Sequence, residues 1–208
     1  MVEEYNDQWE NELEAHNSNL ICDVAQGPVW RKLFSSDYKG SGLCLGLSLF
    51  INWFNPLKNK LAVQKLSMGI ISLNCLNLPP HLQYQTQYTC FSGIIPSPNQ
   101  PMMITINNIL TPLVNELYKL NNGLTILTQK YPHGGKVVVK LVTLVGDIVA
   151  VHKVAGFKSH LATKFCSWCE INASDQHKLE LGSPRKGRNV LEAAVSGKTL
   201  NLHSAKRR

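Results

Sequence analysis

Two polar side chains stand where expected strands end and could take part in phosphoryl chemistry. The run at residues 43–51 is followed directly by Asn52, and the run at 136–145 is followed, after one glycine, by Asp147. In open α/β sheets, functional groups gather at the carboxyl ends of strands. Two Mg²⁺ ions about 3.5–4 Å apart would need carboxylates at both places, because several anionic oxygens must offset their charge. Here one position is an acid and the other an amide.

Asp147 has a second interpretation that needs no metal. A helix is expected over residues 148–154, and a carboxylate just before a helix accepts hydrogen bonds from the backbone N–H groups of its first turn. From sequence chemistry alone, capping of this helix is the simpler role for Asp147, and metal binding is the alternative.

A Cys-x-x-Cys motif forms half of a possible zinc site. The spacing of Cys166 and Cys169 lets both thiolates reach one tetrahedral Zn²⁺ ion. Two more ligands are required, and His160 and His177 are the nearest candidates. The alternative is a pair of buried or idle thiols. A thioredoxin-like redox role is disfavoured, because no βαβ pattern precedes the motif.

Positive charge is concentrated toward the end of a chain whose net charge is +7. Residues 1–30 contain seven acids and no Lys or Arg, residues 31–129 contain seven bases and two acids, and residues 130–208 contain fourteen bases and five acids. A basic surface attracts polyanions such as DNA, although an ordinary solvated surface is the alternative. The candidate nucleic-acid contacts are Lys153, Lys158, Lys164, Arg185, Lys186 and Arg188.

Other side chains near these positions have simpler interpretations. Trp53, Phe54 and Phe157 are better explained as core residues than as platforms on which bases stack. His152 lies in the same basic stretch as Lys153, where it could touch phosphates or belong to a solvated helix face.

Composition excludes several classes of protein. The chain has 208 residues, 44% of them hydrophobic and 17% charged, as in a globular protein of one domain or two small ones. Its first sixteen residues are polar and acidic, unlike a secretory signal, and its apolar runs are shorter than the roughly 20 residues of a membrane span. We therefore expect an intracellular protein with reduced cysteines and no membrane partner. Walker, GxSxG and HExxH motifs are absent from the sequence.

The elements that must position these residues follow from periodicity and from Pro and Gly stops. Strands are expected at 43–52, 65–75, 89–95 and 136–145, and helices at 104–120 and 148–154, with Pro112 weakening the front half of the first helix. The order strand, strand, strand, helix, strand, helix fits an α/β sheet with three sequential strands and a helical crossover.

The domain organisation follows the charge and the motifs. We expect an acidic flexible leader at residues 1–19, a core at 20–165, and a CxxC module with a basic tail at 166–208. Short basic clusters at 185–188 and 206–208 suggest a nuclear location.

Five strings occur in order along the chain. They are LFINWFNP at 49–56, CLNLPPHL at 75–82, GIIPSP at 93–98, KVAGF at 153–157 and FCSWC at 165–169. Together they resemble the transposases of CACTA-type (En/Spm) DNA transposons, in the form abundant in mushroom-forming fungi. The likeness covers roughly residues 21–178, with a weaker echo at 184–194.

This resemblance implies a partial RNase H-like core of the retroviral integrase type, with a mixed sheet and a small CxxC insertion. It also implies a DDE/D cut-and-paste reaction on transposon DNA ends, in which carboxylates hold two Mg²⁺ ions. By motif, Asn52 occupies the position of the first acid and Asp147 that of the second. Cys166 and Cys169 would belong to a zinc-binding insertion.

Two departures from the family pattern change the expected activity. Asn52 replaces an aspartate and removes one negative charge, so Mg²⁺ would bind more weakly. Family members also continue beyond the CxxC to a third acid, whereas this sequence ends at Arg208. We therefore expect a transposase fragment that is catalytically inactive and retains at most DNA binding. The alternative is a zinc-stabilised protein-interaction fragment without DNA activity.

Overall fold

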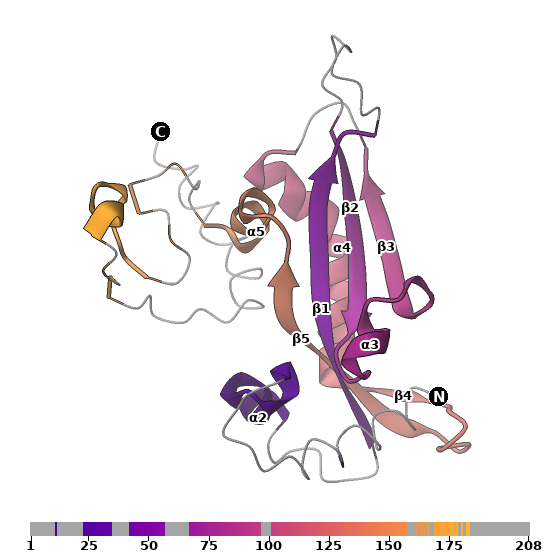
Figure 1. The fold of residues 1–208 in the computed structure, drawn as a ribbon. Coiled ribbons are helices and arrows are strands. Elements are labelled where there is room, and N and C mark those ends of the chain that lie inside the picture. The colour runs from indigo at the N-terminus through magenta and orange to yellow at the C-terminus, as the bar shows by residue number, and fades with distance from the viewer. Residues whose placement is uncertain are drawn as a thin grey trace. The chain divides into compact units, whose positions relative to one another are not determined.

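The computed structural model describes residues 11, 23–34, 42–56, 67–96, 101–157, 161, 163–164, 166, 169–178, 180 and 182–183 (Figure 1). Within these residues the fold is α/β, with a five-stranded sheet in the order β3-β2-β1-β5-β4. The strands are β1 (Gly42–Phe54), β2 (Met68–Cys75), β3 (Thr89–Ile95), β4 (Leu124–Ile126) and β5 (Gly135–Val145).

The two central strands β1 and β5 run parallel. At the start of both strands Gly42 lies against the backbone of Lys136, and farther along Gly146 lies against the carbonyl of Ile51. Positions on β5 therefore advance together with positions on β1. A parallel pair requires a crossover connection, which the intervening strands and helix α4 provide.

Strand β2 runs antiparallel to both of its neighbours. Trp53, near the end of β1, lies beside Gly69 at the start of β2, and Gly69 in turn lies beside Ile95 at the end of β3. At the other end of β2, Asn74 accepts a hydrogen bond from the hydroxyl of Thr89, the first residue of β3. The sheet is therefore mixed.

Helices precede, connect and follow the strands. The α-helices are α2 (Pro28–Phe34), α3 (Pro80–Gln83), α4 (Met103–Asn122) and α5 (Ile148–Ala155). Short 3-10 turns are η1 (Val24–Gln26), η2 (Thr86–Tyr88) and η3 (Ala173–Lys178). No helix in the described part of the chain is both long and apolar enough to cross a membrane.

Contacts between Cα atoms divide the chain into two units. One comprises Met1–Phe50, Ser72–Ser92 and Leu113–Thr143, and the other comprises Ile51–Ile71, Gly93–Pro112 and Leu144–Arg208. Strands β1, β2, β3 and β5 and helix α4 each contribute residues to both units. The site described below belongs to the second.

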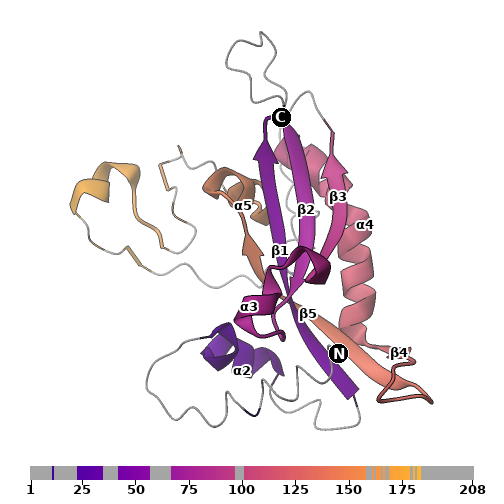
Figure 2. The same ribbon diagram turned by 45° about the vertical axis from the view of Figure 1, so that its right-hand side comes forward.

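The core of the first unit lies between its strands and the second half of α4, which follows one face of β1, β2 and β3 in both views (Figures 1 and 2). Its buried apolar side chains are Leu49, Leu73, Leu76, Leu78, Leu82, Leu117, Val137, Val138 and Val139. Burial of each such side chain stabilises the fold by roughly 1.5–3 kcal/mol. On β1, Gly46 leaves room for the Trp30 indole of α2, since a Cβ there would lie 2.6 Å from the ring.

A turn after β2 fastens this unit through buried amides. The Asn77 side chain accepts a hydrogen bond from Gly46 N at 2.6 Å and donates to Cys44 O at 3.1 Å. Gln83 donates to the carbonyls of Leu76 and Leu78. Backbone groups of β1 and of the turn thereby gain hydrogen-bond partners.

The second unit has its own small core. Ile51, Ile71, Ile95, Ile106, Leu110 and Ala150 are buried in it. Helix α4 continues through Pro112, which lacks an N–H, and the hydroxyl of the preceding Thr111 bonds to Asn107 O at 2.7 Å.

The six expected elements are confirmed with small changes in their bounds, and Pro112 does not interrupt its helix. The α-helices α2 and α3, the strand β4 and the 3-10 turns η1, η2 and η3 were not predicted. Strand β4 pairs antiparallel with β5, with Leu124 opposite Val137 and Ile126 opposite Gly135. The predicted acidic leader lies outside the described residues except for Asn11, and so does the basic tail beyond residue 183.

Candidate functional site

The parallel ends of β1 and β5 bring the Asn52 and Asp147 positions to the same end of the sheet. Gly146, between β5 and Asp147, lies so close to the carbonyl oxygen of Ile51 that no side chain fits there. Asn52 follows Ile51 in β1, just as Asp147 follows Gly146. The glycine therefore sets the close approach on which this site depends.

Asn52 is half-buried near the end of β1. Its side-chain oxygen, the atom that could face a cation, accepts a hydrogen bond from the backbone N–H of Trp53 at 2.8 Å. The amide thus stabilises its own strand end and carries no charge. A carboxylate at this position would add a negative charge and a second acceptor oxygen.

Asp147 caps helix α5. Its Oδ1 atom accepts a hydrogen bond from Ala150 N at 2.7 Å, and its backbone is extended, as an N-cap residue requires. The helix ends at Gly156, whose φ of 72° lies in the left-handed region that glycine adopts most easily. The simpler of the two roles predicted for Asp147 is therefore present in the structure, and the carboxylate remains exposed.

Lys153 of α5 lies over the side chain of Trp53. Its Nζ atom is 4.9 Å from the centroid of the ring, within the range of a cation–π interaction. Burial lowers the pKa of the Lys153 ammonium, and the nearby Asp147 carboxylate opposes part of that effect. The indole nitrogen of Trp53 is buried and finds no hydrogen-bond partner among the described residues.

These residues do not fit the two Mg²⁺ ions that the resemblance implies. Asn52 is neutral, Asp147 supplies one negative charge with one oxygen used as a helix cap, and Lys153 adds a positive charge. Within the described part of the chain, no three His, Cys, Asp or Glu side chains are grouped closely enough to hold a metal ion. Two divalent cations would lack the anionic oxygens needed to offset their charge.

The predicted zinc ligands are only partly described. Cys166 is a half-buried thiol and Cys169 a buried one, whereas His177 is exposed on η3. These three described side chains do not form a metal-binding group with one another. The fourth candidate, His160, lies outside the described residues.

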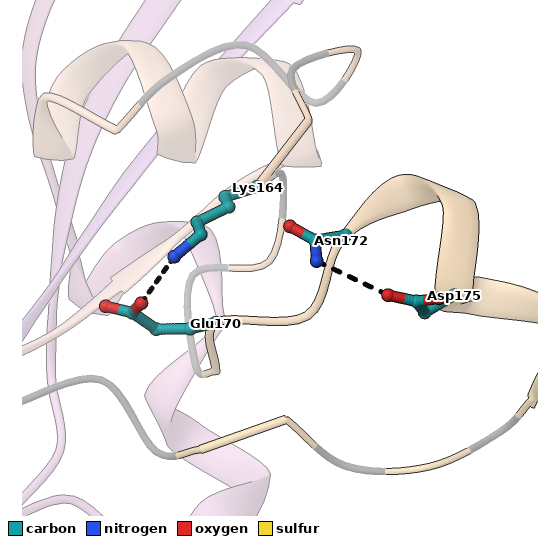
Figure 3. A network of polar contacts seen from close by, with 4 residues as sticks. All are labelled: Lys164, Glu170, Asn172 and Asp175. Atoms are coloured by element: carbon teal, nitrogen blue, oxygen red, sulfur yellow. Dashed lines mark hydrogen bonds and ion pairs between the residues drawn. The ribbon is translucent and has the colours of Figure 1, made fainter.

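Polar contacts join Lys164 to Glu170 and Asn172 to Asp175 in the segment that includes the CxxC motif (Figure 3). Lys164 Nζ lies 2.7 Å from Glu170 Oε2, and Asn172 donates to Asp175 at 3.3 Å. In the same segment, the backbone N–H of Glu170 donates to Ser183 O at 2.9 Å. Lys164 is therefore engaged with an acid of its own segment.

The predicted nucleic-acid contacts have different outcomes. Lys153 lies at the strand ends, and Lys164 forms the ion pair just described. Lys158, Arg185, Lys186 and Arg188 lie outside the described residues. His152, considered as a phosphate contact, is buried instead, with its ring 5.7 Å from that of Phe157.

Two features of the site were missed by reasoning from sequence. The contact between Lys153 and Trp53 joins residues 100 positions apart, and no local pattern signals it. The interpretation of Phe54 as a core residue is wrong, because 46% of its surface is exposed. Ile148 and Val149 are also exposed at the start of α5. The β-strand pattern predicts that a residue lies in a strand, but it does not predict whether other parts of the protein cover its side chain.

Comparison with known proteins supports the transposase part of the resemblance. A search of curated proteins found no match for this chain. The model of the transposase family tnp2 matches residues 20–185, which include β1 to β5, α5 and both cysteines of the CxxC motif. The chain therefore belongs to the tnp2 family of transposases.

Proposed function

We propose that this chain is an RNase H-like core of a CACTA-type cut-and-paste transposase that binds DNA without cleaving it. The observation that carries the proposal is the parallel approach of β1 and β5, which brings Asn52 and Asp147 to one end of the sheet. Three sequential antiparallel strands, a helix, a strand parallel to the first, and a further helix support the fold assignment.

Loss of cleavage follows from the charge of the site. Position 52 is an amide, Lys153 adds an ammonium, and Asp147 supplies one carboxylate at these strand ends. We expect no nicking of supercoiled plasmid DNA in the presence of Mg²⁺ or Mn²⁺. Nicking by the unmodified chain that disappears in Asp147→Ala would overturn the proposal of inactivity.

Restoring the missing acid gives a sharper test. Asn52→Asp should tighten Mn²⁺ binding, measured by calorimetric titration, because it adds a carboxylate beside Asp147. Asn55→Asp, three residues later on the same chain, adds the same charge outside the strand and serves as the matched control. Equal Mn²⁺ affinities for the two variants would show that position 52 is not part of a metal site.

DNA binding should depend steeply on salt, because contacts to phosphates release counterions. Titration of a labelled duplex at increasing KCl concentrations measures this dependence. A binding constant that does not change with salt would remove the electrostatic basis of the proposal.

A second candidate function is a zinc-stabilised module that holds a protein partner. It is favoured by the proximity in sequence of the Cys166 and Cys169 thiols and by the hydrogen bonds that order the backbone beside Cys169. Zinc content per chain should fall in Cys166→Ser and stay unchanged in Cys90→Ser, an exposed thiol in β3. DNA binding by a zinc-free protein would favour the first function over the second.

A further inference from the structure

We infer that the ammonium of Lys153, in place of a divalent cation, contacts a DNA phosphate at the ends of β1 and β5. This inference rests on the proposed DNA binding and specifies how the site takes its substrate without metal. It starts from the finding that the residues present lack the anionic oxygens that a pair of Mg²⁺ ions would need.

The first support is the position of Lys153. The lysine extends from α5 over the face of Trp53, with its Nζ 4.9 Å from the ring centroid. Trp53 lies near the end of β1, and the Asp147 carboxylate, just after β5, acts electrostatically on Lys153, so the cation lies at the ends of these two strands. The indole face also limits the conformations of the lysine side chain and so reduces the entropy lost when an anion binds.

The second support is the local balance of charge. Asp147 is the acid near Lys153, and it already caps α5, where its charge interacts with the positive end of the helix dipole. Asn52 contributes no charge. The Asp147 carboxylate therefore acts on both the helix end and the lysine, and Lys153 presents a positive charge at the ends of β1 and β5 that can bond to a phosphate.

The third support is the exposed apolar side chains at the end of β1 and the start of α5. Phe54 ends β1 and Ile148 begins α5, and about half of each side chain is exposed. Apolar side chains can pack against the sugars and bases next to a bound phosphate. A small inorganic anion would leave this surface exposed, so a nucleic-acid strand is the better match.

The test compares binding of a short duplex with and without metal. We expect the unmodified chain to bind the duplex in EDTA at least as tightly as in Mg²⁺, because Mg²⁺ condensed on DNA competes with the cations of the protein. Lys153→Gln should weaken binding roughly 10-fold, as expected for loss of a charge-assisted hydrogen bond. The slope of the logarithm of the binding constant against the logarithm of the salt concentration should also fall by about one, which corresponds to one phosphate contact. Lys153→Met removes the same charge and keeps an unbranched apolar side chain over Trp53, so it decides the question if Lys153→Gln does not fold.

The matched control is Lys119→Gln. Lys119 is an exposed lysine of α4 that forms an ion pair with Glu116 at 2.7 Å. It lies in the other unit of the chain. Its loss should change affinity by less than about twofold, because it tests only the general charge of the protein.

The possible failures are distinguishable. If the unmodified chain binds no DNA in either buffer, the proposed function and this inference are both wrong. If it binds only with Mg²⁺, or if Lys153→Gln and Lys153→Met match Lys119→Gln, DNA binding stands and the role of Lys153 is wrong.

Discussion

Two asparagines next to strand ends of the same sheet have opposite surroundings. Asn77, after β2, is buried, and its amide bonds to the backbone of Gly46 and Cys44. Asn52, in β1, is half-buried, and its oxygen bonds to the N–H of the next residue. Asn77 therefore joins two segments that are distant in the sequence, whereas the hydrogen bond of the Asn52 oxygen stays within β1.

The contrast separates a structural polar group from a candidate functional one. A buried amide whose oxygen and NH₂ group are both hydrogen-bonded carries little free-energy penalty, whereas its removal leaves its buried partners unbonded and destabilises the fold. Around Asn52, by comparison, the structure has an exposed carboxylate at Asp147, a lysine over an indole ring, and exposed apolar side chains. Groups arranged in this way are suited to meet a ligand.

The largest expected effect is at Gly146, which allows the ends of β1 and β5 to lie close together beside Asn52. Gly146→Ala would place a Cβ against the Ile51 carbonyl, which belongs to the backbone and cannot move aside cheaply. We expect the free energy of unfolding to fall by about 3 kcal/mol or more, measured by urea denaturation. Gly93→Ala in β3 is the control, because nothing lies within 4 Å of its added Cβ. Similar losses for the two variants would contradict the close approach of β1 and β5.

The next effect tests the two asparagines directly. Asn77→Ala leaves the buried Gly46 N–H and Cys44 carbonyl without this partner, so unfolding should become easier by about 2–3 kcal/mol. Asn52→Ala should change stability by less than about 1 kcal/mol, because Trp53 N loses a single, partly exposed bond. Thermal melts of both variants measure the difference. If Asn52→Ala proves the more costly, Asn52 is the structural residue of the two.

A smaller effect separates the two roles of Asp147. Asp147→Ala removes the cap of α5 and should cost about 1 kcal/mol, whereas Asp147→Asn keeps a good capping side chain and should cost less. Chemical denaturation of both variants checks this. Equal losses would show that the charge of Asp147, and not its hydrogen bond to Ala150, stabilises the helix.

The smallest effect is expected at the ion pair beside the CxxC motif. Lys164 and Glu170 are 2.7 Å apart, but about half of each side chain is exposed. Water screens such a pair, so Lys164→Ala should change the free energy of unfolding by no more than roughly 0.5 kcal/mol. A double-mutant cycle with Glu170→Ala measures the coupling. A coupling well above 1 kcal/mol would mean that this pair anchors the segment.

Local sequence was sufficient to predict most elements of the sheet. The β-branched run of β5 and the proline after β3 predicted those strands to within one residue of their observed bounds. It missed β4, which has three exposed residues and exists because it pairs with β5. It also missed α2, although Pro28 at the first helical position is a recognised start signal.

For the candidate site, the residues at the ends of β1 and β5 could be predicted from the sequence alone, and so could the missing charge at one of them. Strand ends, caps and charge are local properties, so Asn52 and Asp147 could be read from their neighbours along the chain. The tertiary structure decided which groups meet. Lys153 reaches Trp53, and Gly146 reaches Ile51, because β1 and β5 lie parallel in one sheet, and strand pairing joins residues that no spacing along the chain connects.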